Sequence, residues 1–70
     1  MVEWSQTELA HGTIWLETKV DNLEIWLEWN DRAMAYRFGI VKNGEPSKSS
    51  LGFADSLEAA KVLCLSSILT

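Results

Sequence analysis

Three glutamates of this 70-residue chain, Glu17, Glu24 and Glu28, come nearest to the types and spacing that catalysis needs. A pair of carboxylates can act as general acid and general base when burial separates their pKa values. These three are predicted on the solvent-exposed face of a sheet, and an open face does not desolvate them. We therefore expect a solvated, charged surface here rather than a catalytic pair.

No other group of residues in the sequence supplies a reaction centre. The single histidine, His11, precedes a glycine in a predicted turn, and the single cysteine, Cys64, falls in a predicted helix. A zinc site needs three or four ligands, and a catalytic triad needs a base beside its nucleophile. The four glycines are scattered and form no phosphate-binding loop. We expect no enzymatic activity, no cofactor and no bound metal.

Two tryptophans share the predicted exposed face with the glutamates. Trp15 and Trp26 alternate with residues that a sheet must bury, which places them opposite the core. As cross-strand neighbours they could stiffen the sheet. As interface anchors they could bind a protein, since aromatic side chains dominate binding hot spots. Both interpretations stay open; under the second, the predicted partner-binding residues are Trp15, Glu17, Glu24, Trp26, Glu28 and Arg37.

Residues 13–41 are predicted to form the three strands that position this face. The first turn is Asp21-Asn22, because Asp and Asn tolerate the positive φ of a two-residue hairpin turn. This turn places Leu16 opposite Leu27 and Lys19 opposite Glu24. The predicted inner-facing residues of the three strands are Ile14, Leu16, Val20, Leu23, Ile25, Leu27, Trp29, Met34, Tyr36, Phe38 and Ile40.

The second turn is predicted at Asn30-Asp31 on the same grounds. It places Leu27 opposite Met34 and Glu24 opposite Arg37. Both predicted registers keep apolar residues facing apolar residues, and a slip of one residue would reverse the faces.

Weaker strand signals flank this meander. Asn43-Gly44 is typical of a third hairpin turn, and the following strand, through about Phe53, is expected at an edge because Pro46 removes a hydrogen-bond donor. Residues 2–9 could form a first strand that turns at His11-Gly12, with a pairing partner that the sequence does not determine.

Residues 55–69 are predicted to be a helix. Asp55 followed by Glu58 has the spacing of a capping box at the helix start. A stripe for packing on the sheet is predicted at Leu57, Ala60, Cys64 and Ile68, with Leu63 or Ser67 beside it. The fold class is therefore α+β, a single domain of residues 1–70. It comprises an antiparallel β-meander of four to five strands with one C-terminal α-helix packed on one face.

Charge narrows the class of partner. The net charge is −4, and residues 1–41 hold seven acids against three basic residues. Because nucleic-acid binding depends on Lys and Arg, we expect no direct binding of DNA or RNA. A protein partner with a basic surface fits better. The sequence has no signal-peptide pattern and no apolar run long enough to span a membrane, so a cytoplasmic protein is expected.

Small size favours self-association. A domain of this length buries only about 60% of its unfolded surface. The chain can form no intrachain disulfide and offers no metal site to compensate. Val62, Leu65 and Leu69 lie off the predicted packing stripe of the helix, on its far side. They are the predicted self-association residues of a homodimer, in which one surface would serve both subunits.

The second half of the chain resembles a pattern found in small phage and prophage proteins. Residues 36–44 read as a strand and hairpin, and residues 51–61 read as a Gly-x-Ala-x-Ser-x-x-x-Ala helix start. That group includes anti-CRISPR and other anti-defence inhibitors, which bind a host protein, often through acidic surfaces that occupy a nucleic-acid groove. The resemblance implies an inhibitor acting in the host cytoplasm. The alternative function is a structural homo-oligomerisation module with no foreign target.

Overall fold

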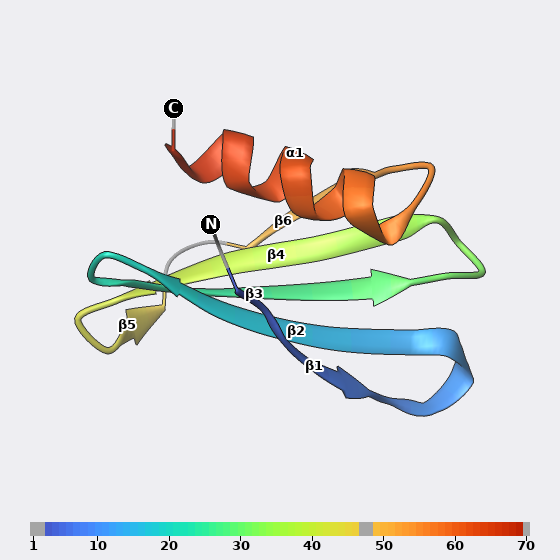
Figure 1. The fold of residues 1–70 in the computed structure, drawn as a ribbon, viewed down its shortest axis with the longest axis horizontal. Coiled ribbons are helices and arrows are strands. Elements are labelled where there is room, and N and C mark those ends of the chain that lie inside the picture. The colour runs from blue at the N-terminus through green and yellow to red at the C-terminus, as the bar shows by residue number, and fades with distance from the viewer. Residues whose placement is uncertain (1–2, 47–48, 70) are drawn as a thin grey trace.

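Alternating apolar residues and tight turns build an antiparallel sheet, and the C-terminal residues build one helix on it (Figure 1). The computed structural model describes residues 3–46 and 49–69, with side chains up to Ser67. Its elements are β1 (Ser5–Glu8), β2 (Thr13–Val20), β3 (Leu23–Asn30), β4 (Ala35–Lys42), β5 (Glu45–Pro46), β6 (Ser50–Phe53) and α1 (Leu57–Leu69). The predicted α+β class, an antiparallel sheet with one C-terminal helix, is confirmed.

The hairpin of β2 and β3 has the predicted register. Ile14 lies opposite Trp29 and Leu16 opposite Leu27. Asp21 takes a φ of 54° in the connecting turn, a left-handed conformation that Asp tolerates better than most residues. A two-residue turn between two strands that bury alternate residues allows one register only, because a slip of one residue would expose the core face.

The predicted register between β3 and β4 is wrong. The connection is a loop of four residues, 31–34, rather than a two-residue turn. Leu27 therefore lies opposite Phe38 and not opposite Met34 as predicted. The side chain of Asn30 explains the longer loop. Its Oδ1 accepts a hydrogen bond from the backbone N–H of Ala33 at 2.9 Å, which closes a turn through a side chain.

This shift changes the cross-strand pairs but leaves the faces of β4 as predicted, because it moves each partner by an even number of residues. Arg37 lies opposite Glu28, whereas Glu24 lies opposite Val41. The predicted inward position of Met34 is wrong. This residue takes a φ of 52° in the loop, and its side chain is exposed.

Short strands form both edges of the sheet. At one edge β1 pairs with β2, which settles the partner of the first strand. The chain turns between them at His11 and Gly12, with φ of 60° and 75° in the short 3₁₀ segment Ala10–Gly12. At the other edge β5 and β6 both pair with β4. The predicted hairpin turn at Asn43 and Gly44 is confirmed, with φ of 54° and 83°.

The predicted helix cap at Asp55 is wrong by one residue. Ser56 Oγ accepts a hydrogen bond from the backbone N–H of Ala59 at 3.2 Å, which makes Ser56 the N-cap of α1. Glu58 instead forms an ion pair with Lys61, at 3.3 Å along the helix. Serine takes this role because it directly precedes the first helical residue, so its short side chain reaches a free N–H group of the first turn.

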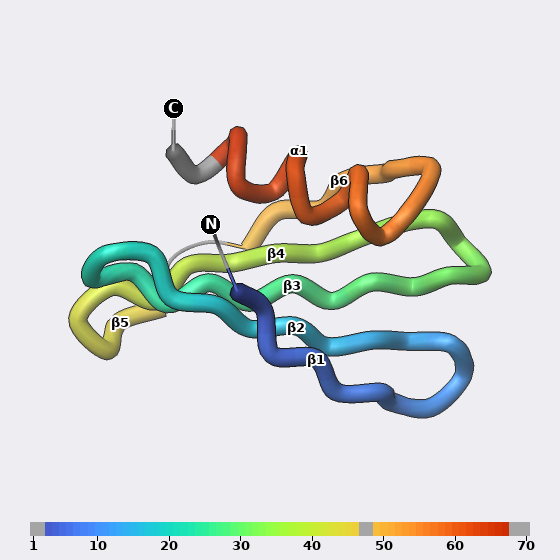
Figure 2. The backbone as a smooth tube through the Cα atoms, in the orientation of Figure 1, coloured from blue at the N-terminus to red at the C-terminus, as the bar shows by residue number. Residues whose placement is uncertain are grey.

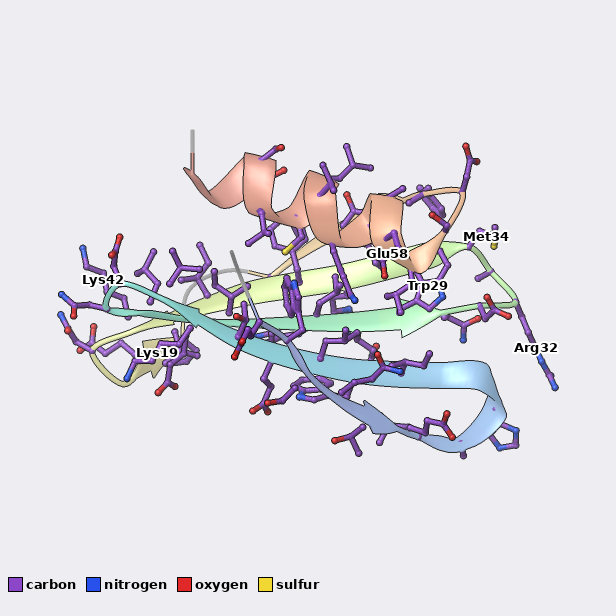
Figure 3. All side chains as sticks on the ribbon, viewed as in Figure 1. Lys19, Trp29, Arg32, Met34, Lys42 and Glu58 are labelled. Carbon is purple, nitrogen blue, oxygen red and sulfur yellow. The ribbon has the colours of Figure 1, made fainter. Side chains whose placement is uncertain are left out.

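The core lies between α1 and the sheet strands β3 and β4, which α1 contacts. Trp29, 1% exposed, lies between the helix and the sheet (Figure 3). Among the residues whose side chains are described, the buried hydrophobic ones are Leu16, Ile25, Leu27, Trp29, Tyr36, Ala60 and Cys64. The predicted packing positions Ala60 and Cys64 are thus confirmed. The predicted Ile68 lies outside the part of the chain whose side chains are described. Figure 2 shows β3 and β4 lying nearer to the helix than β1 and β2.

We expect the free energy of unfolding to fall as pH rises from about 9 to about 11. Burial raises the pKa of the Cys64 thiol from its ordinary value near 9 to about 11. In that interval the unfolded chain releases a proton that the folded chain retains, so stability falls by up to about 1.4 kcal/mol per pH unit. Urea unfolding at pH 7.5, 9 and 10 measures the slope.

The matched control for this prediction is Cys64→Ala, which should be less stable at pH 7.5 but lose most of the slope between pH 9 and 10. Burial also raises the pKa of Tyr36, so a residual slope at still higher pH belongs to the phenol. An unchanged slope in Cys64→Ala would contradict the assignment to the thiol.

Candidate functional site

The six predicted partner-binding residues share one face of the sheet, the face opposite α1, called here the outer face. They alternate with the buried residues of β2, β3 and β4. Trp15 lies directly opposite Glu28, which lies opposite Arg37; Glu17 lies opposite Trp26 in the neighbouring row. The four-residue shift of β4 therefore leaves the predicted set on one surface.

Trp15 and Trp26 form a stacked pair in the middle of the outer face. Their ring centroids lie 5.1 Å apart and their planes differ by 6°. Trp15 Nε1 donates a hydrogen bond to Glu17 Oε1 at 2.8 Å, which fixes the orientation of its indole ring. Stacking and this hydrogen bond hold the pair, called here the tryptophan pair, in one arrangement before any partner arrives.

Trp26 lies against the backbone of the neighbouring strand at Gly39. A Cβ atom placed on Gly39 would lie 2.6 Å from three atoms of the Trp26 ring. Glycine at this position therefore lets the indole rest on the sheet itself. This contact fits the interpretation that the tryptophans stiffen the sheet. Both rings are nevertheless only half-buried, so they are not fully covered. Part of the tryptophan pair stays accessible on the outer face.

The carboxylates around the tryptophan pair are not neutralised by neighbouring cations. In the described part of the chain, the one ion pair joins Lys61 to Glu58 on α1. Glu28 and Arg37 lie directly opposite each other, yet they form no ion pair. Glu24 and Lys19 are likewise opposite without forming one. Because these charges have no ion pair with the described residues, a basic surface can pair with them without first breaking one.

A hollow of about 540 Å³ lies beside the tryptophan pair. Both indoles line it together with Glu17, Glu24 and Lys19, and the segment that enters β1 adds Glu3. The hydroxyl of Thr18 donates a hydrogen bond to the backbone oxygen of Glu3, which ties this segment to β2. The sequence did not point to Glu3 because it left the pairing partner of β1 undetermined. The only available signal was that Glu3 is an acidic residue directly before a tryptophan.

The N-terminal tryptophan does not cover the outer face. Trp4 is half-buried and packs against the buried core from the opposite side of the sheet. Trp4 therefore does not shield Trp15 and Trp26.

Edge strand β6 adds exposed apolar residues to the sheet that the sequence pattern did not single out. Leu51 and Phe53 are 64% and 71% exposed. Phe53 also lines a hollow of about 360 Å³ with Met34 and with Leu63 of α1. We call Leu51 and Phe53 the edge patch; they lie opposite Arg37 and Ala35 of β4, so they belong to the edge of the outer face. The alternation of Leu51 and Phe53 was the available signal, but the polar residues before them suggested a weak strand.

The predicted self-association surface on the far side of α1 is only partly present. Val62 is 63% exposed, as expected. Leu65 is half-buried and packs against the core, so its predicted far-side position is wrong. The reason is that Leu65 directly follows the fully buried Cys64, and the helix lies close enough to the sheet to bury part of Leu65 as well. The side chain of Leu69 lies outside the described part of the chain.

The described residues show no arrangement suited to metal binding and no helix suited to crossing a membrane. Within residues 3–46 and 49–69, no three His, Cys, Asp or Glu residues are placed to hold a metal ion. His11 is exposed at the turn into β2. No helix in the described part of the chain is long and apolar enough to cross a membrane.

Comparisons of the chain with family models, with curated proteins and with solved structures give no match. The outer face and the edge patch are therefore the surfaces that bear on function.

Proposed function

We propose that this chain is a non-enzymatic protein-binding domain whose outer face binds a partner with a basic surface. The observation that carries the proposal is the stacked tryptophan pair on the face opposite the core, beside carboxylates that form no ion pair with the described residues. A sheet needs only one apolar face to fold, and here α1 already covers that face.

The chemistry of the outer face fits protein binding in two respects. Ordered tryptophans bury a large area for little loss of rotamer freedom, which is why they recur as interface anchors. Acidic residues around them attract a basic surface, exclude acidic ones and speed association. An open sheet face offers neither the enclosure nor the desolvation that catalysis by carboxylates requires.

A narrower form of the proposal follows from the resemblance to small phage proteins. A protein that handles nucleic acid presents a basic groove to it, and an acidic, tryptophan-bearing face fits such a groove. We propose that the partner is a nucleic-acid-handling defence protein of the CRISPR type and that this chain inhibits it in the host cytoplasm.

Charge reversal on the outer face is expected to abolish partner capture. Glu24 is exposed in β3 and forms no ion pair with described residues, so Glu24→Arg should leave the fold intact while repelling a basic partner. We expect binding at least about tenfold weaker, a loss of about 1.4 kcal/mol. Affinity purification from bacterial lysate, with mass-spectrometric identification and titration of the captured protein, measures it.

The matched control is Glu45→Arg, which makes the same charge change at an exposed position on β5. Capture that survives Glu45→Arg, fails with Glu24→Arg and weakens with rising salt supports the proposal. Equal effects of the two variants would mean that binding depends on the net charge of the protein and not on the outer face. Capture by both variants as strong as by the wild type would contradict a role for the outer face.

A second candidate function, homo-oligomerisation, is favoured by the edge patch. Phe53 and Leu51 are the two most exposed large hydrophobic side chains among the described residues, and β6 has no paired strand on its outer side. An isologous contact between two copies would bury both residues from each subunit. The segment Ser50–Phe53 carries no charge that would oppose such pairing.

We expect light scattering at about 50 μM to give a dimer mass, and Phe53→Glu to give a monomer with an unchanged circular dichroism spectrum. The substitution should be tolerated by the fold because the side chain is already exposed. Val62→Glu, a charge introduced at an equally exposed site on α1, is the control and should stay dimeric. A monomeric wild type would remove this function.

A further inference from the structure

We infer that the hollow beside the tryptophan pair is a binding site for an arginine side chain of the partner. This inference rests on the proposed function, because it names the chemical group by which a basic partner would be recognised. The hollow is lined by Trp15, Trp26, three carboxylates (Glu3, Glu17 and Glu24) and one ammonium, that of Lys19. Its formal charge of −2 selects a cation.

The shape and chemistry of the lining select a guanidinium among cations. The two indole rings stack on each other within 6° and are only half-buried, so aromatic surface that the stack does not use stays open to a ligand. A guanidinium is planar and weakly hydrated, and it stacks on aromatic faces while donating hydrogen bonds to carboxylates. A lysine ammonium is a compact, strongly hydrated charge that uses such a surface less well.

The site is ordered in the free protein. Glu17 Oε1 accepts the hydrogen bond of Trp15 Nε1 at 2.8 Å, which leaves Oε2 of the same carboxylate for a ligand. Trp26 rests on Gly39 and cannot sink further into the sheet. A ligand therefore meets an aromatic surface and an acceptor that are already placed, which lowers the entropy cost of binding. A hollow of about 540 Å³ lies within the usual range for small-ligand sites, so it admits a long side chain.

A substitution at Lys19 tests the inference with a result that loss of folding could not produce. This ammonium lines the hollow and forms no ion pair in the described part of the chain. Figure 3 shows it at the same end of the sheet as Lys42. Because it repels an incoming cation, Lys19→Gln should strengthen the binding of arginine, whereas a damaged fold could only weaken it.

The experiment titrates the wild-type protein with three blocked tripeptides that differ only in their side chains: triarginine, trilysine and tricitrulline. Binding is followed through the indole N–H signals in nuclear magnetic resonance spectra, assigned with Trp15→Phe and Trp26→Phe. We expect triarginine to shift the signals of both indoles, trilysine to bind at least about fivefold more weakly, and tricitrulline, which is neutral, to leave them unmoved.

Variants then locate the site. Glu17→Gln should weaken triarginine binding at least about fivefold, Lys19→Gln should strengthen it about two- to fivefold, and Glu45→Gln on β5 should leave it unchanged. Equal binding of triarginine and trilysine, unmoved indole signals, or weaker binding by Lys19→Gln would each overturn the arginine site. If the site fails while Glu24→Arg still abolishes capture of a basic protein, the proposed function stands; if both fail, it falls too.

Discussion

Trp29→Ala is expected to unfold most of the protein at 25 °C. Trp29 is 1% exposed between α1 and the sheet, opposite Ile14 on one side and Tyr36 on the other. Replacing a buried tryptophan with alanine typically costs about 3–5 kcal/mol. The core of a domain this small supplies only about 3–5 kcal/mol of net stability. The loss therefore approaches the whole free energy of unfolding.

Circular dichroism and urea titration measure this effect, and the same substitution on the other face supplies its control. Trp15 is half-buried on the outer face, so Trp15→Ala should cost roughly 1–2 kcal/mol and still give a cooperative transition. Comparing the two variants separates the cost of losing any indole from the cost of losing one that is buried in the core. If Trp29→Ala kept a free energy of unfolding within about 1 kcal/mol of the Trp15 variant, the assignment of the two faces would be contradicted.

Those two faces were predictable from the sequence because strand alternation needs no knowledge of loop length. All the inner-facing residues predicted on β2 and β3 lie in or against the core, and the even shift of β4 preserved its faces as well. The pairing of β3 with β4 was not predictable in the same way. It depends on Asn30, whose side chain closes a four-residue loop where Asn-Asp also allows a two-residue turn.

For the helix, too, some features follow from the sequence pattern and others depend on three-dimensional geometry. Its existence and its buried residues Ala60 and Cys64 follow from periodicity. Its exact start does not, because Asp55 and Ser56 both make good caps, and only the backbone path decides which oxygen reaches the free N–H groups. The position of Leu65 likewise depends on how closely α1 lies on the sheet, a tertiary distance that the sequence does not encode locally.

The candidate site was predictable as a set of residues but not as a shape. The sequence placed Trp15 and Trp26 on one face as diagonal neighbours. It gave no indication that the rings stack in parallel, or that the segment around Glu3 would return to line a hollow beside them. The edge patch depends on strand pairing across more than ten residues, so it became visible only once β6 was seen to pair with β4.

Gly39→Ala is expected to displace Trp26 and break the tryptophan pair. The new Cβ would lie 2.6 Å from Cε2, Cζ2 and Nε1 of the indole, a distance that no packed structure tolerates. The ring must rotate away from the sheet, at a cost of about 1–3 kcal/mol in stability. Near-ultraviolet circular dichroism should lose the signal of the stacked rings, while the far-ultraviolet spectrum should keep its sheet content.

A double-mutant cycle with Trp26→Val shows whether the indole is the cause. With valine at that position the indole is gone, so the Cβ of Gly39→Ala no longer meets the ring. The substitution should then stabilise the strand by about 0.5–1 kcal/mol, because alanine is better than glycine inside a strand. The same substitution thus changes sign between the two backgrounds. Destabilisation of equal size in both would mean that Gly39 serves the backbone of β4, and that the tryptophan pair does not depend on it.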